Sequence, residues 1–164
     1  MRALLFRIIY FFVFFGTSTI AGMLIPFLQY KGFDPIQTGS LISLFTLSGL
    51  VGLFSIGYFC DKLKTIKKVL FPSLIITTIT GAIAILFNKG IVFYIGFFLM
   101  GLFNSMLGPL CDCWIMESSN DIKSRFGQLR AFGSVGWAFG VLIVGFVISN
   151  LGYKYVTFIY VGSL

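Results

Sequence analysis

Five apolar runs occupy most of this chain of 164 residues and limit what it can fold into. They cover residues 4–28, 38–60, 69–87, 91–116 and 127–149, and a shorter sixth run covers 155–164. A helix needs about 20 residues to cross the ~30 Å hydrocarbon core of a bilayer, so five runs are long enough and the sixth is not. Within lipid, backbone N–H and C=O groups must be paired inside the segment, which favours helices. The sequence therefore predicts an all-α membrane protein.

The composition supports this fold class and excludes others. Hydrophobic residues make up 58% of the chain and charged residues 10%, whereas about 25% of an average soluble domain is charged. In a membrane protein, a net charge of +7 is expected from Lys and Arg residues that collect in cytoplasmic loops. No basic run has the surface of a nucleic-acid site. We expect a lipid bilayer around the chain and no nucleic-acid partner.

The chain contains three Cys and no His. Cys111 and Cys113 are two residues apart on a predicted helix, so their side chains point in different directions. Cys60 adjoins a predicted cytoplasmic loop, where thiols stay reduced. We therefore expect no metal and no cofactor. Since no nucleophile–base pair is evident either, we expect the protein not to be an enzyme.

The distribution of Lys and Arg predicts which way the chain crosses the membrane. On the side of the N-terminus we place Arg2, Arg7, Lys62, Lys64, Lys67, Lys68, Lys123 and Arg125. On the opposite side we place Lys31, Lys89 and Lys154. Cytoplasmic loops carry the excess of cations, so we expect a multi-pass protein of the plasma membrane with a cytoplasmic N-terminus.

Two opposite charges lie inside consecutive apolar runs, Asp112 in the fourth and Arg130 in the fifth. A charge at membrane depth costs about 3 kcal/mol on insertion scales and usually persists for a function. The spacing of three and four residues places Gly101, Ser105 and Gly108 on the same helical face as Asp112. This small, weakly polar face that ends in a carboxylate is typical of the wall of a binding site.

The fifth run supplies the other half of the predicted substrate site. Arg130, Ser134 and Trp137 share one helical face, and glycines at 133, 136 and 140 form a stripe beside it that lets another helix approach closely. Trp137 offers a flat apolar surface to a sugar ring or an aromatic group, and its indole N–H remains a donor. We expect Asp112, Arg130, Trp137 and Ser134 to bind the substrate.

Other interpretations of these residues stay open. Asp112 and Arg130 can form a structural ion pair that only fixes the register of two helices. Arg130 lies a few residues past a loop, so its guanidinium can also extend to the membrane interface. Trp137 taken alone is more often a packing residue than a ligand contact.

A second motif follows the second run: Gly57-x-x-x-Asp61-Lys62, with Lys67 and Lys68 further on. Lysines in such a loop are by themselves only the mark of a cytoplasmic segment. An Asp at the end of a helix is more specific, because it can cap a neighbouring helix N-terminus and pair with a cation. Such a latch would shift the balance between inward-open and outward-open states, so we expect these five residues to gate the cytoplasmic side.

The residues from Gly57 to Lys68 resemble the loop 2–3 signature of the major facilitator superfamily, Gly-x-x-x-Asp-[Arg/Lys]-x-Gly-x-[Arg/Lys]-[Arg/Lys]. This chain departs from it at Lys64, where the family usually has Gly, and in the slightly shifted spacing of the final cations, Lys67 and Lys68. The resemblance covers the whole chain, since five runs and part of a sixth match the N-terminal six-helix half. It implies five full transmembrane helices and a truncated sixth.

Within that superfamily, the stretch from Phe126 to Trp137 resembles helix 5 of the lactose permease-like oligosaccharide:proton symporters. The resemblance implies that Arg130 binds the sugar, that Trp137 stacks on it, and that Ser134 lies beside it. It places Asp112 where that family has a sugar-binding Glu on helix 4. The chain departs here too, because Asp has one methylene less than Glu. The phenylpropionate permease and nucleoside symporter relatives have a similar pattern.

The function expected from these features is secondary active transport by alternating access, as proton-coupled symport of a sugar or glycoside. The chain would be incomplete and would need a missing C-terminal half or a partner subunit. In the symporters that it resembles, the proton-coupling residues lie mostly in that second half. One alternative is transport of nucleosides or aromatic acids. Another is a truncated membrane protein that binds partners without transporting a solute.

Overall fold

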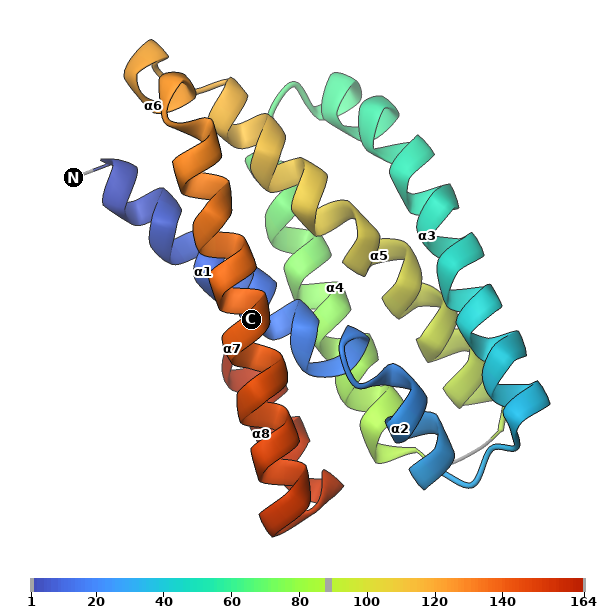
Figure 1. The fold of residues 1–164 in the computed structure, drawn as a ribbon. Helices are drawn as coiled ribbons and strands as arrows, with labels where there is room; N and C mark the ends of the chain where they lie inside the picture. The colour runs from blue at the N-terminus through green and yellow to red at the C-terminus, as the bar shows by residue number, and fades with distance from the viewer. Residues whose placement is uncertain (1, 88–89, 164) are drawn as a thin grey trace.

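A computed structural model describes residues 2–87 and 90–163, which are almost entirely helical and contain no strand (Figure 1). The helices are α1 (Arg2–Ala21), α2 (Leu24–Tyr30), α3 (Pro35–Leu63), α4 (Lys67–Leu86), α5 (Ile91–Met116), α6 (Asn120–Ser124), α7 (Phe126–Leu151) and α8 (Val156–Ser163), with a 3-10 turn, η1, at Tyr153–Tyr155. Five of them, α1, α3, α4, α5 and α7, contain a stretch that is long and apolar enough to cross a membrane. The predicted all-α membrane fold is confirmed. Residues 88 and 89, between the third and fourth apolar runs, lie outside the described part.

The first apolar run is not one helix, as the sequence had suggested, but two. α1 ends at Ala21 and α2 begins at Leu24. The cause is Pro26, which has no N–H to donate to the carbonyl of Gly22 four residues earlier and whose ring would clash with that carbonyl. Within α2, hydrogen bonding between residues four apart resumes with Phe27, whose N–H donates to the carbonyl of Met23 at 2.9 Å.

The second run begins as a helix one turn earlier than expected. Asp34 accepts a hydrogen bond from the backbone N–H of Gln37 at 2.7 Å, and the Gln37 side chain accepts from the N–H of Asp34 at 3.3 Å. This reciprocal pair is a capping box, which satisfies two backbone donors at once. Pro35 is the first helical residue, where its missing N–H costs nothing.

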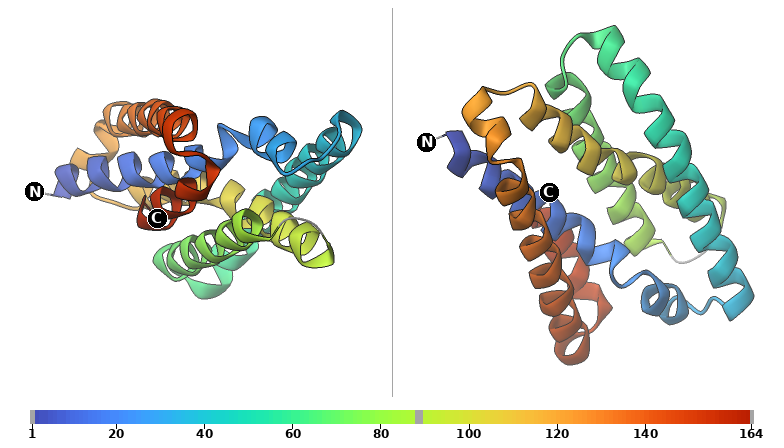
Figure 2. Two further views of the ribbon diagram at one scale, coloured as in Figure 1. Left: turned by 90° about the horizontal axis from the view of Figure 1, so that it is seen from below. Right: turned by 45° about the horizontal axis from the view of Figure 1, so that its top comes forward.

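The helices form two groups. α1 lies along α7 and contacts α8, while α5 packs between α3 and α4; seen from the end, the two groups stand side by side (Figure 2). The glycine stripe of α7 makes the close approach to α1 that was predicted. A Cβ at Gly136 would overlap the carbonyl of Phe11, and one at Gly140 would overlap the Ser18 hydroxyl. Small residues of this kind drive helix association in lipid.

The same device joins α3 to α5. A Cβ at Gly52 would overlap the carbonyl of Leu102, and one at Gly101 would overlap the Ser48 hydroxyl. Gly49 likewise leaves space for the side chain of Ser105. Gly101 and Ser105 therefore serve partly to pack α5 on α3, and the small face predicted on the fourth run does not belong to a binding site alone.

One end of the bundle carries most of the cations among the described residues. The N-terminus, the α3–α4 connection and α6 lie at that end, and α2 lies at the other (Figure 1). Lys62, Lys64, Lys67, Lys68 and Lys123 are exposed there. The separation is the one that the predicted orientation requires, and the orientation itself stays a prediction. Lys89, which was counted on the other side, lies outside the described residues.

Lys64 ends α3 in the left-handed region, with φ of 50°. This is the position at which the superfamily signature has Gly. For a residue with a Cβ the left-handed conformation costs roughly 1–2 kcal/mol, and Gly adopts it without that clash. Lys64, which stands where the superfamily signature has Gly, is thus a strained C-cap of α3.

We predict that Lys64→Gly raises the free energy of unfolding by about 1 kcal/mol, because relief of the clash exceeds the ~0.4–1 kcal/mol that Gly adds to the freedom of the unfolded chain. The midpoint of thermal unfolding in detergent should rise by about 2–4 °C. Lys62→Gly, in the last turn of α3, is the control and should lower the midpoint. An unchanged or lowered midpoint for Lys64→Gly would contradict the assignment of strain.

Candidate functional site

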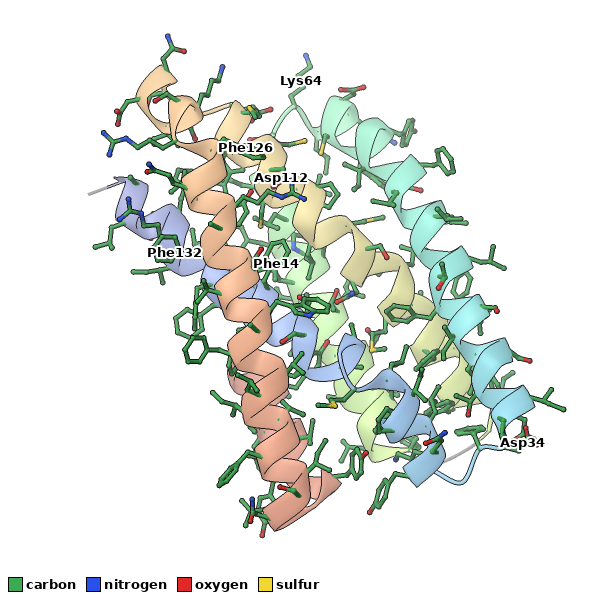
Figure 3. All side chains as sticks on the ribbon, in the orientation of Figure 1. Phe14, Asp34, Lys64, Asp112, Phe126 and Phe132 are labelled. Carbon is green, nitrogen blue, oxygen red and sulfur yellow. The ribbon has the colours of Figure 1, made fainter. Side chains whose placement is uncertain are left out.

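The carboxylate of Asp112, which Figure 3 labels, joins three helices. Its Oδ2 pairs with the Arg130 guanidinium of α7. Its Oδ1 accepts a hydrogen bond of 2.6 Å from the Tyr10 hydroxyl of α1. The side chain of Asp112, on α5, is 22% exposed and that of Arg130 is 54% exposed. The structure thus brings together the two charges singled out in the sequence and adds a hydroxyl to them.

Tyr10 is a site residue that the sequence reasoning missed. It is fully buried, and a buried Tyr hydroxyl almost always has a hydrogen-bond partner. The sequence does contain a feature that could have identified it: Tyr10 is the one Tyr in the Phe-rich run between residues 4 and 28. What could not be read from the sequence was that its partner lies 102 residues away.

Arg130 uses only part of its hydrogen-bonding capacity on Asp112. Its Nη1 makes the ion pair, and the guanidinium carbon lies 5.9 Å from the ring centre of Phe126. A guanidinium has five N–H donors, and more than half of this side chain is exposed. Donors therefore remain for a second acceptor while the pair with Asp112 is intact.

Trp137 borders a pocket of ≈ 180 Å³ between α1, α5 and α7. The pocket is lined by Val13, Phe14, Thr17, Asn104, Ser105, Gly108, Pro109 and Trp137. Two of its hydroxyls donate to their own helices: Thr17 to the carbonyl of Phe14 at 3.1 Å and Ser105 to that of Gly101 at 2.9 Å. The pocket combines two aromatic rings, those of Phe14 and Trp137, with a few polar groups, as small-molecule sites do.

Asn104 is the second residue that the sequence reasoning missed. It is the amide side chain in the lining of this pocket, and within the described part of the chain no hydrogen bond to its amide is found. An amide offers two donors and one acceptor, which suits a solute hydroxyl. Its spacing of four from Gly108 on the fourth run placed it on the predicted face and could have identified it.

The predicted substrate residues do not all meet in one place. Asp112 and Arg130 form the ion pair, and Trp137 lines the pocket without either of them. Ser134 is exposed on α7 and lines no part of that pocket. Along α5 the ion pair lies one turn beyond the pocket, from Gly108 to Asp112.

The loop motif is at the basic end of the bundle. Gly57, Asp61, Lys62, Lys67 and Lys68 are all exposed. The ammonium of Lys62 lies 5.5 Å from the ring centre of Tyr58, and that of Lys67 lies 5.3 Å from that of Trp114. Among the described residues Asp61 makes no ion pair, so the predicted latch is not formed in this structure.

We predict that Tyr10→Phe lowers the free energy of unfolding by about 1.5–3 kcal/mol, because it removes a hydrogen bond to a charged group. Tyr160→Phe is a matched control: Tyr160 is equally buried, and its hydroxyl donates to the uncharged carbonyl of Thr77 at 2.7 Å. That control should cost about 0.5–1.5 kcal/mol. Thermal unfolding in detergent measures both. Equal costs would contradict a charged partner for Tyr10. So would a cost that stays as large in an Asp112→Asn background, where the acceptor is uncharged.

Comparisons with known proteins agree with the resemblance seen in the sequence. The profile of the Major Facilitator Superfamily matches residues 7–164. The maltose permease of Geobacillus stearothermophilus is 22% identical over 153 residues, which are 93% of this chain and 39% of that relative's length. No solved structure matches the chain. With five apolar helices and a match over nearly its whole length, the chain belongs to the major facilitator superfamily and corresponds to the N-terminal half of its fold.

Proposed function

We propose that this chain forms the solute-binding N-terminal part of a symporter that moves a sugar or glycoside together with a proton. Membership of the superfamily supports a transporter. We propose in addition that its solute is a sugar or glycoside and that a proton moves with the solute in the same direction. The observation that carries it is the Asp112–Arg130 pair, held inside a membrane bundle one turn from a pocket that Trp137 borders.

The chemistry of these groups fits a polyhydroxylated ring. A carboxylate accepts hydrogen bonds from hydroxyls and a guanidinium donates to them, and ionised partners make such bonds roughly twice as strong. Trp137 provides an apolar surface for a sugar ring. Asn104 can both donate to and accept from a hydroxyl. A relative described as a maltose permease is a further reason to choose sugars over nucleosides or aromatic acids.

Transport would follow alternating access. In this mechanism two helical halves rock around a site near the middle of the membrane, and this chain would supply one wall of that site. Gly57, Asp61, Lys62, Lys67 and Lys68 would latch the cytoplasmic side in one state and release it in the other. A C-terminal half or a partner subunit would supply the opposite wall and the proton-coupling groups, and the proposal assigns the proton to no residue of this chain.

We predict that Arg130→Lys weakens sugar binding at least tenfold, because Lys lacks the planar fork that binds Asp112 and a solute together. Glucose and maltose serve as probes, with calorimetric titration of the purified protein in detergent. Arg125→Lys is the matched control: Arg125 pairs with Asp121 at 3.1 Å on the exposed α6 segment and should bind within about twofold of wild type. Equal binding by Arg130→Lys, or no binding of either sugar by wild type, would contradict the proposed function.

The proposed orientation, in a plasma membrane with the basic end inside, predicts a labelling pattern. In a variant whose three cysteines are replaced by Ala, a new cysteine at Lys123 should react with an impermeant maleimide only after the cells are opened. A cysteine at Ile36, which is 82% exposed at the other end, should react in intact cells. External loops carry few cations, so this end is the one that the proposal places outside. The reverse pattern would place the N-terminus outside.

A further inference from the structure

The ring of Phe14 fills a slot between α5 and α7. A Cβ at Gly108 would lie 3.6 Å from the Cζ of this ring, and a Cβ at Gly133 would lie 3.0 Å from its Cδ2. The two glycines thus leave room for one aromatic ring from α1. Phe14 also lines the pocket that Trp137 borders, so one side of the ring belongs to the wall of that pocket.

The slot lies between the two parts of the proposed site. On α7, Gly133 follows Arg130 by three residues and precedes Trp137 by four, so it sits about one turn from each. On α5, Gly108 lines the pocket and Asp112 follows one turn later. Figure 3 places Phe14 next to Asp112 along the bundle, on the side away from Phe126. The ring therefore separates the pocket from the ion pair.

Tyr10 ties the ring to the ion pair. The rings of Tyr10 and Phe14 stack with their centres 5.7 Å apart and their planes 13° apart. The Tyr10 hydroxyl donates to Asp112 at 2.6 Å. Stacking stabilises aromatic pairs beyond the burial of their surfaces, so the carboxylate, the Tyr10 ring and the Phe14 ring hold one another in place.

The size of the pocket follows from this arrangement. At ≈ 180 Å³ it is smaller than the roughly 300–1,000 Å³ of sites for drug-sized ligands. A solute that reaches from the pocket to the ion pair between α5 and α7 needs the space that Phe14 occupies. We propose, building on the proposed function, that Phe14 determines the size of the solute: it favours single-ring sugars and disfavours two-ring sugars.

A residue that only packs helices together would behave differently. Its truncation would lower stability and weaken the binding of all sugars alike. A residue that limits size changes the ratio between a large and a small sugar. The ratio of the dissociation constants of maltose and glucose is therefore the informative quantity, because loss of stability common to both sugars cancels in it.

The test measures glucose and maltose binding to the purified protein with Phe14→Leu and Phe14→Ala, the former as the variant that best preserves packing. We expect the ratio of the maltose to the glucose dissociation constant to fall at least tenfold in Phe14→Ala and by a smaller factor in Phe14→Leu. Phe12→Ala is the matched control, since Phe12 is on the same helix, 49% exposed, and lines no part of this pocket. A ratio that Phe14→Ala leaves unchanged overturns the inference.

A readout without sugar separates this inference from the proposed function. In a Trp114→Phe background Trp137 is the one tryptophan, so its emission can be excited selectively over that of the tyrosines. Phe14→Ala should increase its quenching by acrylamide because the pocket then opens towards the ion pair. Phe12→Ala should leave the quenching unchanged. If wild type binds neither sugar, the proposed function fails, and the separating role of Phe14 is decided by the quenching alone. Unchanged quenching in Phe14→Ala overturns that role.

Discussion

The carboxylate of Asp112 is a largely buried charge on an apolar helix, and the arrangement of three helices depends on how it is satisfied. Left alone at membrane depth, such a group costs about 3 kcal/mol or more. Here Tyr10 of α1 and Arg130 of α7 each bind one of its oxygens. Because removing one partner would leave a largely buried charge, this interaction fixes the register of α1, α5 and α7 relative to one another.

Close helix packing is what makes that interaction possible. Gly136 and Gly140 let the backbone of α7 approach α1, and Gly52 and Gly101 do the same between α3 and α5. Van der Waals contact between small residues replaces the hydrophobic effect, which is absent between helices in lipid. The polar site then lies where α1 and α7 meet α5. Its two parts, the ion pair and the pocket of Trp137, are divided by the one large ring that the glycines admit.

The sequence predicted some of this structure for physical reasons and missed the rest for others. Run lengths predicted five spanning helices, because bilayer thickness sets helix length. The break after Ala21 could have been predicted from Pro26, because this residue has no N–H to donate to the carbonyl of Gly22. The pairing of Asp112 with Arg130 was one of several open readings, since helical spacing gives the face of a residue but not its neighbour. The partner of Tyr10 and the slot of Phe14 depend on packing between distant segments, which no local pattern encodes.

The central claim is that Asp112 and Arg130 bind a solute and do more than hold two helices in register. Exchanging the two charges, as Asp112→Arg with Arg130→Asp, tests it most directly, because a structural pair survives exchange and a solute site does not. We expect the exchanged protein to stay folded, to unfold at a somewhat lower temperature because the Tyr10 hydroxyl loses its carboxylate acceptor, and to bind glucose and maltose at least tenfold more weakly. Wild-type sugar affinity in the exchanged protein would show that the pair is only structural.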